Sequence, residues 1–285
     1  MSGEAGHAGG SAARAARPAP LARLPVGLCR DLSFLFSDID DTLTTHGMLP
    51  ESSYGALWDL MRAGIRVVPV TGRPAGWCDH IARMWPVAGV VGENGAFYYA
   101  YDRERRVMTR RQIPAEPGAP AFDRDTLART AARVLREVPG TALAADQAFR
   151  VSDFAIDYCE DVAPLPPESV DHICRILAEE GVHFKVSSIH VNFWLGSFDK
   201  LSGVRLFLSG EGMGTLEDLA ERALFIGDSP NDEPLFAGFA HSIAVGNLRR
   251  FLPGLTHRPE FITERDSAEG FREAADAILA GRANQ

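Results

Sequence analysis

The chain has 285 residues, of which 46% are apolar and 24% are charged, and its formal net charge is −9. This length and apolar content allow a large buried core and favour two domains. The negative charge argues against nucleic acid and anionic membranes as partners. Four cysteines without a CxxC pair indicate neither a zinc site nor a disulfide framework, so we expect a cytoplasmic protein.

Residues 1–30 differ in composition from the rest of the chain, being rich in Ala, Gly, Arg and Pro with a single acid, Glu4, before Asp31. They lack the apolar region of a secretory signal. We expect a disordered extension, because so few apolar side chains cannot bury enough surface to order it. A transit peptide is the alternative that this Arg-rich, acid-poor composition leaves open.

From about residue 32, short apolar strands alternate with amphipathic helices. Strands are predicted at 32–37, 65–70 and 88–94, with helices at 51–63 and 75–84 between them. This order indicates right-handed crossovers and a parallel sheet that is buried on both faces.

The pattern changes near residue 97. A hairpin is predicted over 96–113, and the strand at 153–158 alternates as a half-exposed strand does. The other elements expected here are helices at 127–138 and 170–177 and strands at 183–188 and 189–195. Short strands with two helices indicate an α+β module.

The strand–helix order returns after about residue 196. Helices are predicted at 200–208, 215–221, 231–239 and 268–280, and strands at 223–227, 241–246 and 260–263. The predicted fold class is therefore α/β. A Rossmann-like parallel-sheet core of residues 31–97 and 196–285 is interrupted by an inserted α+β cap domain of residues 98–195.

The segment FLFSDIDDTLT places Asp38, Asp40 and Asp41 directly after an apolar strand, and GDSPND supplies Asp228 and Asp232 after another. Ligands of an open parallel sheet bind beyond the carboxyl ends of its strands. Carboxylates gathered there suit Mg²⁺, which takes one or two of them together with waters and phosphate oxygens. A bound cation would also offset the repulsion between the aspartates.

Phosphoryl transfer is the chemistry that such groups can perform. One carboxylate can attack phosphorus and form an aspartyl-phosphate. A second can protonate the leaving oxygen and then take a proton from water. Threonine and lysine side chains can hold the phosphoryl oxygens as charge develops.

Four segments occur in the order of the motifs of the haloacid dehalogenase (HAD) superfamily, which the chain resembles. They are DIDDT, the threonine that ends VVPVT, Lys200, and GDSPND. The insertion between the second and third motifs, with TGRP, GENGA and FDK, is similar to class IIB. That class includes sucrose-phosphate, trehalose-phosphate and mannosyl-3-phosphoglycerate phosphatases. The resemblance covers roughly residues 33–282.

The resemblance implies a Mg²⁺-dependent phosphoric monoester hydrolase that acts on a small phosphorylated metabolite, most simply a sugar phosphate. Asp38 would be the nucleophile and Asp40 the general acid/base. Asp38, the backbone carbonyl of Asp40, and Asp228 would hold Mg²⁺, with support from Asp232. The phosphate-binding residues would be Thr71 and Lys200.

Four further residues are candidate substrate contacts, although each also has a simpler structural explanation. Arg73 lies in a segment that can serve as a helix start, and Asn94 can be a turn residue beside Gly95. His190 and Asn192 alternate on a predicted cap strand, where polar residues commonly form the solvent-facing side. The protein is expected to be a monomer or homodimer.

Two positions depart from the family pattern. Asp41 and Leu201 each stand where this superfamily usually has glycine. Two other functions stay open at this point. A phosphomutase would use the same aspartyl-phosphate, and a non-catalytic sensor would keep the phosphate pocket. The intact Asp38/Asp40 pair argues against the sensor.

Overall fold

The structure, a computed structural model, describes residues 17–114, 123–187 and 189–283. The described residues form two compact units, one within Met1–Ile65 and Leu219–Gln285 and the other within Arg66–Asp218. The first unit is assembled from the two ends of the chain and the second is continuous. The expected boundaries of the cap at residues 98 and 195 remain a prediction.

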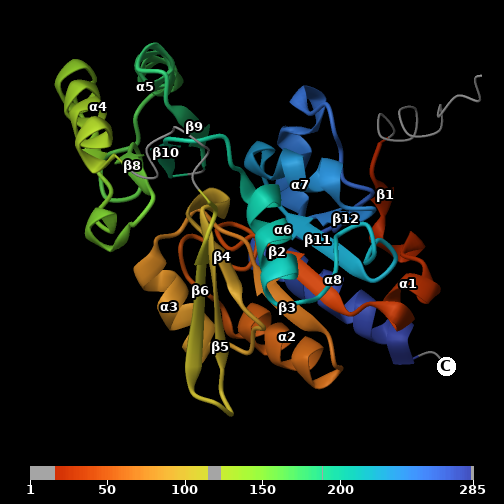
Figure 1. Cartoon of the computed structure of the whole chain (residues 1–285). Helices are drawn as coiled ribbons and strands as arrows, with labels where there is room; N and C mark the ends of the chain where they lie inside the picture. Colours follow the sequence, from red (N-terminus) through yellow and green to blue (C-terminus); the bar gives the residue numbers. More distant parts are fainter. Residues whose placement is uncertain (1–16, 115–122, 188, 284–285) are drawn as a thin grey trace, which may run out of the picture. The chain divides into compact units, whose positions relative to one another are not determined.

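A parallel sheet forms the centre of the first unit. Its strands are adjacent in the order β1, β13, β12, β11 and β2, and every pair is parallel (Figure 1). The strands are β1 (Ala19–Pro20), β2 (Phe34–Ser37), β11 (Ala223–Gly227), β12 (His241–Ala244) and β13 (Phe261–Ile262). All residues of β2 and β11 are buried, as expected for a central parallel sheet. The predicted α/β class is confirmed.

Two helices of this unit pack along the last helix of the chain. The helices are α1 (Val26–Asp31), α2 (Glu51–Arg62), α7 (Glu233–Gly238) and α8 (Ser267–Ala283). Short 3₁₀ turns complete the unit at η2 (Leu21–Arg23), η5 (Pro230–Asp232), η6 (Gly246–Arg250) and η7 (Leu252–Gly254). Both α1 and α2 contact α8, and Arg272 on α8 pairs with Asp59 on α2.

The structure differs from the prediction of a disordered extension over residues 1–30. From Ala19 onward the chain forms β1, η2 and α1, and Leu21, Leu28 and Cys29 are buried. Arg282 of α8 donates hydrogen bonds to the carbonyl oxygens of residues 29, 30 and 32. A few apolar side chains and these tertiary hydrogen bonds order a segment whose composition alone predicts disorder. Residues 1–16 lie outside the described residues.

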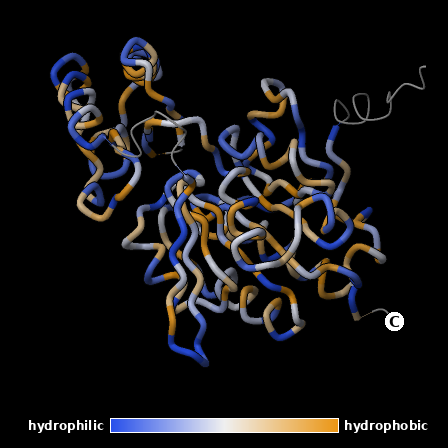
Figure 2. Tube along the Cα trace, viewed as in Figure 1, coloured by the Kyte–Doolittle hydropathy of each residue, from blue (hydrophilic) through white to orange (hydrophobic). Residues whose placement is uncertain are grey.

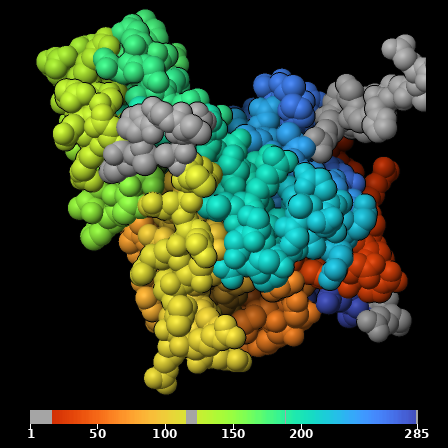
Figure 3. Space-filling view, viewed as in Figure 1, coloured from red at the N-terminus to blue at the C-terminus, as the bar shows by residue number. Residues whose placement is uncertain are grey.

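The second unit begins with β3 (Arg66–Pro69), α3 (Ala75–Met84) and β4 (Val90–Gly92). The strands β4, β5 (Phe97–Asp102) and β6 (Val107–Gln112) form an antiparallel sheet, so the predicted hairpin is confirmed. The yellow β5–β6 hairpin forms part of the surface (Figure 3). Both α3 and α6 (Lys200–Gly210) pack against β4 and β5.

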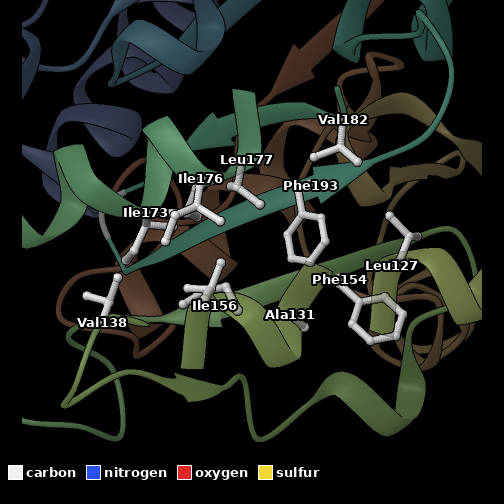
Figure 4. Close-up of a cluster of buried hydrophobic side chains, with 12 residues drawn as sticks. Leu127, Ala131, Val138, Phe154, Ile156, Ile173, Ile176, Leu177, Val182 and Phe193 are labelled. Atoms are coloured by element: carbon white, nitrogen blue, oxygen red, sulfur yellow. The ribbon is translucent and has the colours of Figure 1, made fainter. Parts of the chain in front are cut away.

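A second antiparallel sheet of this unit has the strand order β7, β8, β10, β9. Its strands are β7 (Ala142–Leu143), β8 (Asp153–Asp157), β9 (His183–Val186) and β10 (His190–Trp194). The helices α4 (Arg124–Glu137) and α5 (Pro167–Glu179) enclose an apolar core against one face, with Phe154, Ile156 and Phe193 among its residues (Figure 4). Along α4 the residues alternate between hydrophilic and hydrophobic, as a helix with one buried face requires (Figure 2).

Two details of the predicted secondary structure are wrong. Both β8 and β10 are buried along their whole length, so the expected half-exposed strand has a polar but covered second face. Turns replace the helix expected at 215–221. The Asp218 carboxylate accepts hydrogen bonds from the backbone and hydroxyl of Thr215, a local pattern that competes with helix formation.

No helix within the described ranges is both long enough and apolar enough to cross a bilayer.

The first turn of α6 lies against the loop after β4, at a point where only glycine fits. A Cβ added at Gly203 would lie 2.5 Å from Val91 Cγ1 and 2.6 Å from Gly95 Cα. Gly55, within α2, has no neighbouring atom within 4 Å of its added Cβ. Gly203 and Gly55 therefore offer a comparison between two helical glycines, one with atoms in the way of a Cβ and one with free space for it.

We expect Gly203→Ala to lower the free energy of unfolding by about 1–3 kcal/mol, because the backbone of Gly95 cannot move away cheaply. Gly55→Ala should raise it by up to about 1 kcal/mol through helix propensity. Urea unfolding of both variants measures the difference. Equal effects at the two positions would contradict the close contact at α6.

Candidate active site

Three buried carboxylates meet at one edge of the parallel sheet in the first unit. Asp38 follows β2, and its backbone N–H donates to the carbonyl oxygen of Ile226 on β11, at 2.9 Å. One oxygen from each of Asp38, Asp228 and Asp232 lies within 4.8 Å of the others. The pairing of β2 with β11 thus places the two strand ends, and their aspartates, side by side.

Backbone hydrogen bonds hold Asp232 in this cluster. Its Oδ2 accepts from the backbone N–H groups of Asp228, at 3.0 Å, and of Ser229, at 3.4 Å. Any side chain at Gly227 would overlap this carboxylate, which accounts for the glycine at the end of β11. The GDSPND segment therefore forms a turn that directs both of its aspartates, Asp228 and Asp232, into the cluster with Asp38.

Asn247 is a residue of the cluster that the sequence analysis missed. Its amide donates to Asp228 Oδ2, at 3.0 Å, and to the carbonyl oxygen of Asp41, at 3.2 Å. Its own side-chain oxygen accepts from the N–H of Ser267 at the start of α8. One side chain thus joins both aspartate segments to α8. The signal was its place just after the strand predicted at 241–246, at the same edge of the sheet.

The three carboxylates are suited to a divalent metal ion. They offer only oxygen atoms, they are at most 5% exposed, and burial of so much negative charge needs a cation nearby. Oxygen donors of this kind match the preference of Mg²⁺. Asp40 lies in the turn after Asp38 and is partly exposed.

The backbone conformation at Asp41 explains why glycine is usual there. Its φ of 57° lies in the left-handed region, which glycine adopts without strain and aspartate tolerates better than most residues. The Asp41 N–H donates to Thr44 Oγ1 at 3.1 Å, so a local hydrogen bond supports this conformation. Aspartate in place of the usual glycine therefore adds backbone strain at this position, which the hydrogen bond to Thr44 offsets in part.

Thr71, Asn94 and Lys200 gather around one loop of the second unit, the 3₁₀ turn η3 (Glu93–Gly95). The Thr71 carbonyl oxygen accepts from the N–H of Asn94 at 3.0 Å. Gly95 has a φ of 105°, and a Cβ there would overlap the backbone just before Lys200. Lys200 is the first residue of α6 and is buried.

The departure at Leu201 leaves this packing intact, because the close approach of α6 to the loop occurs at Gly203. The helix start is fixed by Asp199, whose side chain accepts from the N–H of Ser202 at 2.8 Å. Lys200 therefore lies in the first turn of a capped helix, α6. The position of this helix against the loop is set by close contacts at Gly203 and Gly95.

A network of buried polar side chains connects this loop to β8 and β10. Asp153 accepts from the amides of Asn94, at 3.4 Å, and Asn192, at 3.0 Å, and from the Arg150 guanidinium, at 2.9 Å. Arg150 also donates to the carbonyl oxygen of Gly72. Asn94 and Asn192, which the sequence placed among possible substrate contacts, thus both bind the same buried carboxylate.

The other two predicted substrate contacts meet at Glu160. Arg73 donates to Glu160 Oε1 at 3.0 Å, and His190 Nε2 lies 2.9 Å from Glu160 Oε2. His190 and the Arg73 guanidinium lower the pKa of the Glu160 carboxyl to about 2, although partial burial acts in the opposite direction. Sequence reasoning did not single out Glu160, because no strand or motif marks it.

Glu93 is a buried acid that the sequence analysis also passed over. Its carboxylate accepts hydrogen bonds from the backbone N–H groups of Ala75, Val151, Ser152 and Asp153. Burial, together with the charge of Asp153, raises the pKa of Glu93 to about 8. Four N–H donors on one carboxylate tie the segment before β8 to the start of α3. The acid within GENGA was its only sequence signal.

Comparison with protein families finds one match that bears on this arrangement. Residues 35–120 match the model of a family described as haloacid dehalogenase-like hydrolase. No curated protein sequence matches the chain significantly.

Solved structures share the fold over nearly their whole length. A Thermoplasma acidophilum protein has a TM-score of 0.66 at 15% identity, covering 87% of this chain and 98% of its own. A HAD subclass IIB sugar phosphatase has a TM-score of 0.59 at 14% identity, with coverage of 87% and 99%. A sucrose-phosphatase from Synechocystis sp., crystallised with sucrose and phosphate, has 0.58 at 16%, with coverage of 88% and 98%.

The chain has the haloacid dehalogenase fold. The resemblance inferred from the four motifs is thereby confirmed in the family match and in the fold. In this HAD-fold protein, the first unit carries the predicted metal ligands and the second carries the predicted phosphate-binding residues.

Substitution of Asp41 separates backbone strain from loss of charge. We expect Asp41→Gly to leave the free energy of unfolding unchanged or raise it slightly. Asp41→Ala should be less stable than the glycine variant by about 1 kcal/mol, because only glycine adopts the left-handed region freely. Urea unfolding of the two variants checks this, and equal stabilities would show that φ at this position is not the constraint.

The low pKa of Glu160 makes part of the stability acid-sensitive. Its ordinary pKa is near 4.5 and the folded value is about 2. The ionised carboxylate therefore stabilises the fold fully above about pH 4.5, and this contribution is lost as the pH falls toward 2. Glu160→Gln should show a smaller loss of unfolding free energy between about pH 5 and pH 3 than the parent protein. Urea unfolding at both pH values measures it, and equal losses would contradict the assigned pKa.

Proposed function

We propose that the protein is a Mg²⁺-dependent phosphatase that hydrolyses a small phosphorylated metabolite, with sugar phosphates as the favoured class. The observation that carries this proposal is the convergence of Asp38, Asp228 and Asp232 at the carboxyl edge of the parallel sheet. The HAD family match and the similarity to structures of sugar phosphatases support it.

The metal ion would be held by Asp38, Asp228 and the backbone carbonyl of Asp40, with Asp232 nearby. When bound, it would offset the charge of the aspartates and polarise the phosphoryl oxygens. Asn247 holds the Asp228 carboxylate in place through the hydrogen bond described above. Such support fixes the direction of a ligand oxygen.

Asp38 and Asp40 would share the covalent chemistry. An oxygen of Asp38 attacks phosphorus, and the bond to the leaving oxygen breaks while Asp40 protonates that oxygen. Water then attacks the aspartyl-phosphate, the bond between phosphorus and Asp38 breaks, and Asp40 takes the proton from the water. Hydrolysis of a phosphate monoester requires a barrier reduction on the order of 20 kcal/mol. The covalent route replaces one difficult displacement by two easier ones, each of which must have a low barrier.

Thr71 and Lys200 would hold the transferring phosphoryl group. Both belong to the second unit, where the loop of η3 positions them. A cytoplasmic location, inferred from cysteine usage, and a monomeric or homodimeric state remain predictions.

Release of inorganic phosphate from a panel of sugar phosphates tests the proposal. We expect turnover that requires Mg²⁺ and stops with EDTA. Asp38→Asn should lower kcat by at least about 10³-fold, because no other group forms the covalent bond. The matched control is Asp171→Asn, an exposed aspartate on α5, which should leave kcat unchanged.

Three results would contradict the proposal. If the kcat of Asp38→Asn were within tenfold of that of the parent protein, Asp38 would not be the nucleophile. Transfer of phosphate between sugars without its release would identify a phosphomutase. Binding of sugar phosphates without turnover of any of them would favour a sensor.

A further inference from the structure

The guanidinium of Arg73 is already engaged by carboxylates of its own unit. It lies 3.0 Å from Glu160 Oε1 and 3.8 Å from Asp146 Oδ2, and it stacks over the ring of Trp77. Its side chain is only 5% exposed. An arginine next to a phosphate-binding threonine is commonly taken to attract an anion, but here its charge is offset from within the protein.

The charges around Arg73 leave no positive excess. Four carboxylates, Glu93, Asp146, Asp153 and Glu160, face two guanidiniums, Arg73 and Arg150, and one imidazole, His190. With Glu93 ionised and His190 neutral, the sum is −2. With Glu93 protonated and His190 charged, it is zero. In every protonation state of these two groups the cluster is neutral or negative.

Glu160 is the carboxylate of this cluster that a ligand can reach. Its side chain is 29% exposed, whereas that of Asp146 is 9% exposed and that of Asp153 is fully buried. The position of Glu160 is fixed by Asp157, whose carboxylate accepts from the N–H groups of residues 159, 160 and 161. The carboxylate is therefore a built feature of the turn after β8.

The cluster adjoins the proposed phosphate-binding residues within the same unit. The N–H of Arg73 donates to Thr71 Oγ1 at 3.0 Å. Asn94 connects Thr71 to Asp153 through its backbone and its side chain. A substrate whose phosphate lies at Thr71 would thus have the rest of its structure near a surface with no cationic surplus.

We propose that Glu160 is a specificity-determining residue that selects monoesters whose leaving group is an uncharged polyol. It rejects those whose leaving group carries a second anion. The inference rests on the proposed phosphatase function. Glu160 acts in two ways, by offsetting the charge of Arg73 and by presenting its own negative charge to the ligand. A like charge brought against an exposed carboxylate is an effective means of rejecting the wrong ligand.

A matched pair of substrates tests this selection. Glucose 6-phosphate and 6-phosphogluconate have the same phosphate and six-carbon chain and differ at C1, which is a hemiacetal in the first and a carboxylate in the second. We expect the parent protein to have a kcat/KM at least about tenfold higher for glucose 6-phosphate, with most of the difference in KM. In Glu160→Gln the ratio should fall at least about tenfold, because the exposed like charge that repels the added carboxylate is then removed.

Two variants serve as controls for the charge and for the fold. Glu180→Gln removes a carboxylate that pairs with Arg133 on the helical side of the sheet, and its ratio should equal that of the parent. Glu160→Asp keeps the charge and should also keep the preference for the neutral sugar. Circular dichroism checks that each variant folds. If Glu160→Gln does not fold, the inference is tested by the ratio of kcat/KM for the two sugars in the parent protein and in Glu160→Asp.

The outcomes separate this inference from the proposed function. A parent protein that prefers 6-phosphogluconate, or a ratio unchanged in Glu160→Gln, overturns the inference while hydrolysis of p-nitrophenyl phosphate upholds the phosphatase. Absence of phosphate release from p-nitrophenyl phosphate and from both sugars overturns the two together. A ratio that moves in Glu180→Gln as much as in Glu160→Gln assigns the effect to net charge and also overturns the inference.

Discussion

Parallel hydrogen bonding between β2 and β11 is the constraint on which the candidate active site depends. The register pairs Ser37 with Ile226, so the residues that follow both strands emerge together at the carboxyl edge. Two buried carboxylates would otherwise separate, since their repulsion in a low-dielectric interior is large. The backbone ladder, the turn at Asp232 and the amide of Asn247 hold them close. The structure thus places negative charge where a cation can offset it.

The second unit depends on a different form of charge burial. Glu93 satisfies four backbone N–H groups, and Asp153 collects a guanidinium and two amides. Each of these two buried acids accepts hydrogen bonds from several segments of the chain, some of them distant in sequence, as burial of polar groups requires. This network fixes the loop at Thr71 to the polar face of the antiparallel sheet. It therefore links the proposed phosphate-binding residues to the side chains proposed to select the substrate.

Burial also changes how the candidate substrate residues are understood. Arg73, His190, Asn94 and Asn192 are all nearly inaccessible, and each contacts an acid of the same unit. The contacts that the structure gives these side chains are with Glu160 and Asp153. Under the proposed function, selectivity would depend on the net charge that these side chains present to a ligand, to which the exposed carboxylate of Glu160 contributes.

Much of the protein followed from the sequence alone. The order of apolar strands and amphipathic helices predicted the α/β class, and the motif spacing predicted which aspartates follow which strands, because both signals are local. Only the tertiary structure showed that residues 19–31 form regular elements and that the polar face of β8 and β10 is covered. It also decided the contacts of Glu93, Asn247 and Glu160. These features arise from contacts between residues far apart along the chain. No local periodicity encodes which carboxylate meets which guanidinium, since that pairing is set by where the folded backbone brings each one.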